Sequence, residues 1–131
     1  MKTLIVEDDF TSRLLLQEIL KDYGTTHVAV DGQEAVKAVC LALDSRAPYQ
    51  LICLDIMMPK MDGQTALRLI RAQEEGRGIV SSDAAKIIMT TALSDLKNVS
   101  TAYRGLCDAY LTKPIQKARL LEELRKLELI A

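Results

Sequence analysis

The sequence has few residues that could bind a soft metal or build a disulfide framework. It contains three cysteines, Cys40, Cys53 and Cys107, and one histidine, His27, and it has no Cys-x-x-Cys pair. An odd number of widely spaced cysteines, each among apolar neighbours, favours reduced thiols in a core over a zinc site or disulfides. Reduced thiols are typical of the cytoplasm, and we expect a cytoplasmic protein.

The sequence also lacks a strong charge of either sign and any long apolar run. Its formal net charge is −1, so no basic surface for nucleic acid is expected. No apolar run is long enough to cross a bilayer. The amino terminus turns acidic at Glu7 after only three apolar residues, which does not fit a signal peptide. We therefore expect neither a nucleic-acid nor a membrane partner.

What the sequence does contain is a regular alternation of two kinds of apolar pattern. The 131 residues are 49% hydrophobic, enough for one domain with a substantial core. Short apolar runs predict strands at residues 4–6, 27–30, 51–54, 87–89 and 109–111. Helical spacing predicts helices at residues 12–23, from Asp31 onward, 64–73, 95–104 and 115–127. Residues 74–83 are expected to form an exposed loop.

This order of elements predicts an α/β fold. Strands separated by single helices run parallel, because each helix returns the chain to the starting edge of the sheet. Five helices can cover both faces of the resulting five-stranded parallel sheet. Ligands of such sheets bind beyond the carboxyl ends of the strands.

Polar side chains gather at those carboxyl ends. The residues that follow the first, third, fourth and fifth strands are Glu7, Asp8, Asp9, Asp55, Thr90, Thr91, Thr112 and Lys113. Clustered carboxylates resist ionising together, so a positive charge must offset them. Mg²⁺ prefers carboxylate ligands, and Lys113 supplies a second positive charge. Acids, metal, lysine and hydroxyl are the parts needed to transfer a phosphoryl group to a carboxylate.

Simpler interpretations exist for single members of this group. Asp31 is followed by Glu34 three residues later, and this capping-box spacing favours a helix cap. For Asp9, too, a cap or turn is preferred over a metal ligand. Lys113 stands before Pro114 and, taken alone, would be a surface lysine in a turn. The joint pattern is much more specific than any one member.

Four stretches of the sequence resemble the receiver domain of bacterial two-component response regulators. They are residues 4–9, 54–63, 89–92 and 110–114, and the resemblance extends over essentially the whole chain. It implies a doubly wound, flavodoxin-like sheet with strand order 2-1-3-4-5 and five helices. Because the last predicted helix ends near Leu127 and the sequence ends at Ala131, we expect a stand-alone protein with one receiver domain over residues 1–131 and no output domain.

The resemblance implies a phosphoacceptor and a metal site. Asp55 would accept phosphate from a phosphohistidine on a sensor histidine kinase or a histidine phosphotransfer protein. Glu7 and Asp8 would hold Mg²⁺ with Asp55 and the backbone carbonyl of Met57. Whether Asp9 takes the place of Glu7 at the metal stays open.

The resemblance also implies a switch. Thr91 matches the residue whose hydroxyl moves to the phosphoryl group, and Lys113 matches the lysine that neutralises that group. Tyr110 matches the aromatic residue that turns inward. The bond from Lys113 to Pro114 is often cis in such domains. The switched surface would comprise the fourth helix, fifth strand and fifth helix. It would bind a downstream effector protein or serve onward phosphotransfer, so the protein is not expected to be a conventional enzyme.

Two alternatives and one kinetic expectation remain. A haloacid-dehalogenase-type phosphatase requires a second Asp two residues after the nucleophile, where this chain has Met57. A degenerate receiver would bind partners without phosphorylation, although the complete residue set argues against it. Met57 and Leu93 cannot orient an attacking water, so we expect a long-lived phosphoryl group.

Overall fold

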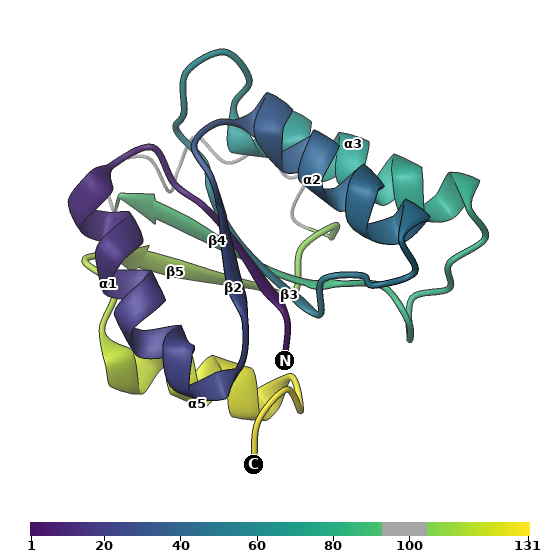
Figure 1. Ribbon diagram of the computed structural model, residues 1–131. Coiled ribbons are helices and arrows are strands. Elements are labelled where there is room, and N and C mark those ends of the chain that lie inside the picture. Colours follow the sequence, from purple (N-terminus) through teal and green to yellow (C-terminus); the bar gives the residue numbers. More distant parts are fainter. Residues whose placement is uncertain (93–104) are drawn as a thin grey trace.

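Five parallel strands form one sheet in the order β2-β1-β3-β4-β5 in the computed structural model (Figure 1). The strands are β1 (Thr3–Val6), β2 (Thr26–Ala29), β3 (Leu51–Asp55), β4 (Lys86–Ala92) and β5 (Ala109–Lys113). The helices are α1 (Phe10–Leu20), η1 (Lys21–Tyr23), α2 (Gly32–Asp44), α3 (Gly63–Gly76) and α5 (Lys117–Lys126). The predicted flavodoxin-like strand order is confirmed. The structure describes residues 1–92 and 105–131, so the predicted helix at 95–104 lies outside the described residues.

The helices form a layer on each face of the sheet. Helices α2 and α3 lie on one face, and α1 and α5 lie on the other (Figure 1). Successive residues of a strand point to opposite faces, so the inner strands β1, β3 and β4 contribute to both cores. Leu4, Ile52 and Ile87 pack on the α2–α3 side. Ile5, Cys53 and Ile88 pack on the α1–α5 side. This double burial explains why the strands read as uninterrupted apolar runs.

Three aspartates begin the helices that follow β1, β2 and β3. The backbone N–H groups of Ser12, Glu34 and Thr65 donate to Asp9, Asp31 and Asp62 at 2.9, 2.9 and 2.8 Å. These bonds satisfy helix N–H groups that have no partner within the helix. They confirm the cap interpretation of Asp31 and the preferred interpretation of Asp9. The hydrogen bonds from Ser12 also lower the pKa of the Asp9 carboxyl.

Helix α3 runs further than the sequence predicts. The expected exposed loop at 74–83 is wrong at its start, because α3 continues through Gly76 and Glu74 is only 4% exposed. Burial of Glu74 depends on partners that are distant in sequence and are described below. The three cysteines are free, and Cys53 is buried whereas Cys40 and Cys107 are half-buried.

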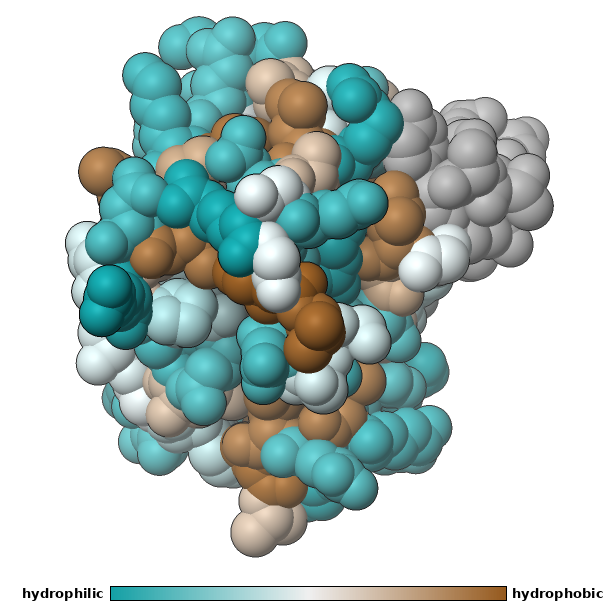
Figure 2. Space-filling model, turned by 90° about the vertical axis from the view of Figure 1, so that its right-hand side faces the viewer, coloured by the Kyte–Doolittle hydropathy of each residue, from teal (hydrophilic) through white to brown (hydrophobic). Residues whose placement is uncertain are grey.

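None of the described helices combines the length and the apolarity that a membrane span requires. The face of the molecule in Figure 2 interleaves hydrophilic and hydrophobic residues. The expectation that residues 1–131 form one domain without an output domain stays a prediction.

Candidate functional site

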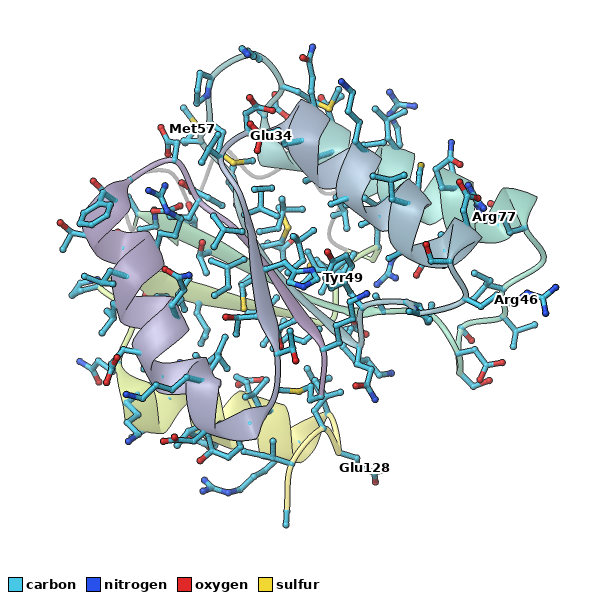
Figure 3. All side chains as sticks on the ribbon, viewed as in Figure 1. Glu34, Arg46, Tyr49, Met57, Arg77 and Glu128 are labelled. Carbon is cyan, nitrogen blue, oxygen red and sulfur yellow. The ribbon has the colours of Figure 1, made fainter. Side chains whose placement is uncertain are left out.

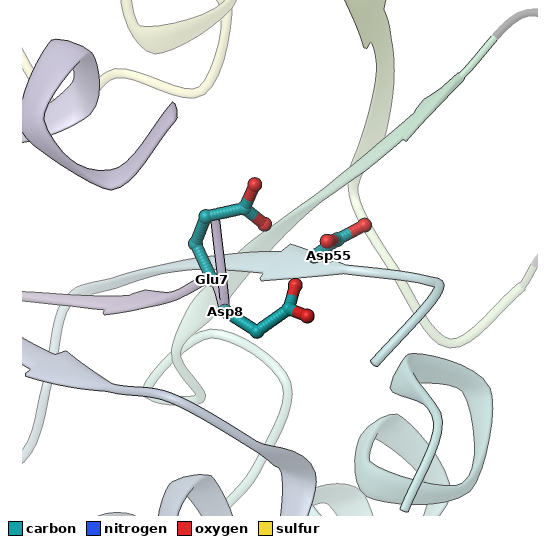
Figure 4. Close-up of side chains that lie close together, drawn as sticks. All are labelled: Glu7, Asp8 and Asp55. Atoms are coloured by element: carbon teal, nitrogen blue, oxygen red, sulfur yellow. The ribbon is translucent and has the colours of Figure 1, made fainter. Parts of the chain in front are cut away.

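Three carboxylates converge where β1 and β3 end. The side chains of Glu7, Asp8 and Asp55 point toward one another (Figure 4), and one oxygen from each lies within 4.8 Å of the others. Glu7 is 1% exposed and Asp55 is 4% exposed, whereas Asp8 is exposed. The group is therefore buried on one side and open to solvent on the other. Asp9, which caps α1, is not part of it.

Lys113 at the end of β5 completes the cluster. Its Nζ donates to Glu7 Oε1 at 2.6 Å and to Asp55 Oδ2 at 3.1 Å. The peptide bond between Lys113 and Pro114 is cis. Four of the predicted site residues, from three strand ends, are thus brought together.

The cluster contains more negative charge than one lysine can offset. Burial raises the pKa of Glu7 to about 7, and the neighbouring Asp55 adds to this effect, while Lys113 opposes it. Burial lowers the pKa of Lys113, but its hydrogen bonds and ion pairs with the two acids outweigh burial and raise it. Glu7 Oε2 is buried and makes no hydrogen bond within the described part of the chain. One oxygen of the Glu7 carboxylate therefore has no hydrogen-bond donor among the described residues.

Backbone contacts fix Asp55 tightly. Met57 N donates to Asp55 Oδ1 at 3.2 Å, and Ile56 N donates to Thr90 O at 3.0 Å. The first residue of α3, Gly63, packs so closely that a Cβ there would lie 2.2 Å from the carbonyl oxygen of Asp55. Only glycine fits at that position without displacing the end of β3.

Met57 lies in the loop that follows β3, two residues after Asp55 (Figure 3). Its side chain is exposed, at 58%. Its predicted role as a metal ligand through the backbone carbonyl stays a prediction. An exposed thioether has neither a proton to give nor a strong acceptor for a water molecule.

The two predicted switch residues lie on β4 and β5. Thr91 is fully buried, and its Oγ1 donates to the carbonyl oxygen of Ala92 at 3.1 Å. Tyr110 is half-buried and packs against the core on the α2–α3 side. Burial raises the pKa of the nearby Cys107 thiol, and a hydrogen bond with Tyr110 opposes that rise. The switch roles of Thr91 and Tyr110 stay predictions.

Sequence reasoning gave no role to Thr90. This residue is 2% exposed and pairs in register with Asp55 across β3 and β4. Residues two apart in a strand share a face, so Thr90 shares its face with Ile88, which packs on the α1–α5 side.

Comparisons with known proteins show the family to which this fold belongs. A family model for the response regulator receiver domain matches residues 3–125. The chain belongs to this family. It is 34% identical over 128 residues to the chemotaxis protein CheY of Listeria monocytogenes, covering 96% of this chain and 97% of that protein. It also matches sensor proteins and histidine kinases, of whose length it spans 6% to 13%.

Two solved receiver domains are similar in structure. One belongs to a sensor histidine kinase of Pseudomonas aeruginosa, crystallised with a magnesium ion coordinated in the active site cleft. It has a TM-score of 0.75 and 29% identity, covering 95% of this chain and 94% of that one. The other is the receiver domain of the Saccharomyces cerevisiae response regulator Ssk1, in complex with the histidine phosphotransfer protein Ypd1. It has a TM-score of 0.79 and 27% identity, covering 96% and 87%. The chain is thus a receiver domain of two-component signalling.

Proposed function

We propose that Asp55 of this receiver domain accepts a phosphoryl group in a Mg²⁺-dependent reaction, and that the modification switches a surface for a partner protein. The observation that supports this is the position of Lys113 Nζ, which bonds both Glu7 and Asp55 beside a group of three converging carboxylates. Phosphoryl transfer requires mainly positioning and charge neutralisation, and this arrangement provides both.

The residues present fit a hard divalent cation. Glu7 Oε2 is a buried carboxylate oxygen without a hydrogen bond in the described part of the chain, and a cation would satisfy it. Glu7, Asp8 and Asp55, with the backbone carbonyl of Met57, would hold Mg²⁺, which binds oxygen ligands and retains some of its waters. When bound, the cation would neutralise charge on the phosphoryl oxygens.

The chain's own groups account for the rest of the reaction. An oxygen of the Asp55 carboxylate attacks phosphorus, the new O–P bond forms, and the P–N bond to the donor histidine breaks with its electron pair returning to the imidazole. Lys113, held beside Asp55 by the pairing of β4 with β5, supplies a positive charge to the transferred group. The buried setting strengthens that interaction.

The partners follow from this chemistry. The donor would be a sensor histidine kinase or a histidine phosphotransfer protein, and the solved complex of a similar yeast receiver with such a protein supports the second. Added phosphate brings roughly −1.5 to −2 charge, by analogy with phosphoserine. Thr91 and Tyr110 would respond to it, and an effector protein or onward phosphotransfer would carry the output, in the cytoplasm. The protein would then be a switch and not a conventional enzyme.

Intact-mass measurement after incubation with acetyl phosphate and Mg²⁺ tests this proposal. The wild-type chain should gain one phosphoryl group, and Asp55→Asn should gain none because the attacking carboxylate is absent. Asp9→Asn is the matched control. Asn caps a helix about as well as Asp, and Asp9 lies outside the carboxylate group, so this variant should still be phosphorylated.

The other outcomes are equally distinct. Phosphorylation of Asp55→Asn to the wild-type level would refute the assignment of the acceptor. Continuous hydrolysis of acetyl phosphate would indicate a phosphatase, and neither uptake nor hydrolysis would indicate a degenerate receiver. The exposed Met57 side chain predicts an acyl phosphate that lasts well beyond seconds, and faster loss would contradict that expectation.

A further inference from the structure

The loop that carries Met57 joins β3 to α3 and comprises residues 56–62. Its two ends are fixed by hydrogen bonds. Gly63 N donates to Ile56 O at 2.8 Å, and Met57 N donates to Asp55 Oδ1 at 3.2 Å. How firmly the backbone of Met57 is held then depends on what holds the middle of the loop.

The middle of the loop lies against the first turn of α2. A Cβ on Gly32, the first residue of that helix, would lie 2.5 Å from Met61 O and 2.9 Å from Met61 Cβ. Gly32 is buried, and Met58 and Met61 pack against the core on the α2–α3 side. A side chain at Gly32 has no room, so this glycine allows the loop to approach the helix closely.

An ion pair ties the same part of the loop to α2. Lys60 Nζ lies 3.7 Å from Asp31 Oδ2, and the side chain of Asp31 is only 6% exposed. The other oxygen, Asp31 Oδ1, accepts the N–H of Glu34 and caps the helix. A buried carboxylate needs a counter-charge, and Lys60 is the ion-pair partner that Asp31 has within residues 1–92 and 105–131.

The backbone of Lys60 indicates that its side chain is used. Its φ is 65°, in the left-handed region that glycine adopts most easily. Glycine would fit this conformation better than lysine, but it could not pair with Asp31. The sequence thus has a charged side chain at a position where the backbone favours glycine.

We propose that Asp31 and Gly32 are positioning residues that hold the loop through Lys60 and Met61, and thereby fix the backbone of Met57 for the cation. This inference rests on the proposed function, in which the carbonyl of Met57 binds Mg²⁺. Mg²⁺ requires nearly ideal octahedral geometry, so it binds less tightly when one ligand belongs to a loosely held loop.

In Lys60→Met, two explanations predict opposite changes in Mg²⁺ affinity. The variant keeps an apolar stem and loses the ammonium. If Lys60 acted only through its charge, removing a positive charge from the loop would tighten Mg²⁺ binding. If the ion pair holds the loop, binding should weaken, by about threefold for one partly exposed pair. Calorimetry without a phosphodonor measures this affinity.

Hydrogen exchange at the Met57 amide gives a second measurement that needs neither metal nor phosphate. This N–H donates to Asp55 Oδ1, and it should exchange about threefold faster in metal-free Lys60→Met. Lys60→Arg keeps the ion pair and should match wild type in both measurements. The matched control is Lys37→Met, which removes an exposed lysine of α2 that has no ion pair among the described residues, and it should also match wild type.

Gly32→Ala tests the close approach of the loop to α2. The new Cβ would displace Met61, so Mg²⁺ binding should weaken and the Met57 amide should exchange faster, both by more than in Lys60→Met. Gly76→Ala, with nothing within 4 Å of its new Cβ, is the control. If Gly32→Ala is unfolded by circular dichroism, the Lys60 variants decide alone.

The remaining outcomes separate the two proposals. The inference is overturned if Lys60→Met binds Mg²⁺ as tightly as wild type or more tightly, or if Lys60→Arg is as weak as Lys60→Met. Unchanged exchange at Met57 in Lys60→Met would overturn it as well. If the wild-type chain binds no Mg²⁺, the proposed function fails, whereas faster exchange at Met57 in Lys60→Met would still show that α2 holds the loop.

Discussion

Two clusters of charged side chains, each with a buried glutamate, lie at opposite ends of the sheet, and their hydrogen bonds are complete to different degrees. The acceptor cluster, Glu7, Asp8, Asp55 and Lys113, lies at the carboxyl ends of the strands. The Arg71 cluster, Arg71, Glu74 and Asp108, joins α3 to the starts of β4 and β5.

Every side-chain oxygen of Glu74 has a donor. Arg71 Nη1 donates to Glu74 Oε1 at 2.8 Å, and the backbone N–H of Ala85 donates to Glu74 Oε2 at 2.8 Å. Arg71 also reaches the carbonyl oxygens of Ala85 and Leu106, both at 2.8 Å. The acceptor cluster instead leaves Glu7 Oε2 buried without a donor in the described residues. Complete hydrogen bonding is what a structural ion pair needs, and an incomplete set marks a place for a ligand.

Breaking the Arg71 cluster should have the largest effect on stability. Arg71→Met removes the guanidinium and leaves Glu74, which is 4% exposed, as a buried acid without its ion-pair partner. We expect the free energy of unfolding to fall by about 3 kcal/mol, measured by urea unfolding at neutral pH.

Lys126→Met is the control for this loss of charge. Lys126 pairs with Glu122 at 3.5 Å and Glu123 at 3.6 Å, with 61% of its own side chain exposed. Exposed pairs contribute little, so we expect a change below about 0.5 kcal/mol. Equal losses in the two variants would contradict the distinction between the clusters.

The acceptor cluster should show itself in the pH dependence of stability. The folded state raises the pKa of Glu7 from 4.5 to about 7, so folding binds this proton more tightly than the unfolded chain does. Below pH 4.5 Glu7 makes its full contribution to the free energy of unfolding. This contribution is lost as the pH rises toward 7, and the loss is about 3 kcal/mol at most.

Metal-free wild type and Glu7→Gln, unfolded by urea across that pH range, give the comparison. Relative to Glu7→Gln, the wild-type free energy of unfolding should fall between pH 4.5 and 7. Added Mg²⁺ should reduce the fall because a cation favours the ionised acid. Parallel curves for the two proteins would show that Glu7 has no raised pKa.

A smaller effect is expected where α3 meets the acceptor strand. In Gly63→Ala the new Cβ would collide with the carbonyl oxygen of Asp55, and we expect a loss of about 1–3 kcal/mol in urea unfolding, with slower phosphorylation. Gly76→Ala, at the other end of the same helix, has no atom within 4 Å of the new Cβ and should keep or slightly raise stability. Similar losses in both variants would rule out the close approach as the cause.

The same contrast explains what the sequence could predict. The acceptor cluster was predictable because Glu7, Asp55 and Lys113 each follow a recognisable apolar strand, and a parallel sheet must align those ends. The Arg71 cluster was missed because Glu74 precedes a segment rich in glycine and serine and reads as exposed. The donors that satisfy Glu74 are the backbone N–H of Ala85 and Arg71, which also pairs with Asp108, and no local pattern relates Ala85 or Asp108 to Glu74. Only the spacing of Arg71 and Glu74, three apart in a helix, was visible.

The roles of single hydroxyls were the least predictable. The switch role of Thr91 rests on the resemblance alone and stays a prediction. The register of β3 with β4 shows only that Thr90 lies level with Asp55.

Helix α3 makes contact with both clusters. Its first residue, Gly63, packs against the peptide of Asp55. Eight residues later, Arg71 donates a hydrogen bond to the carbonyl oxygen of Leu106, shortly before β5. About 12 Å of helix separates these contacts, stiffened by internal hydrogen bonds. We therefore expect α3 to move as one rigid body. A displacement of the Asp55 peptide would be transmitted along the helix to the segment that precedes β5.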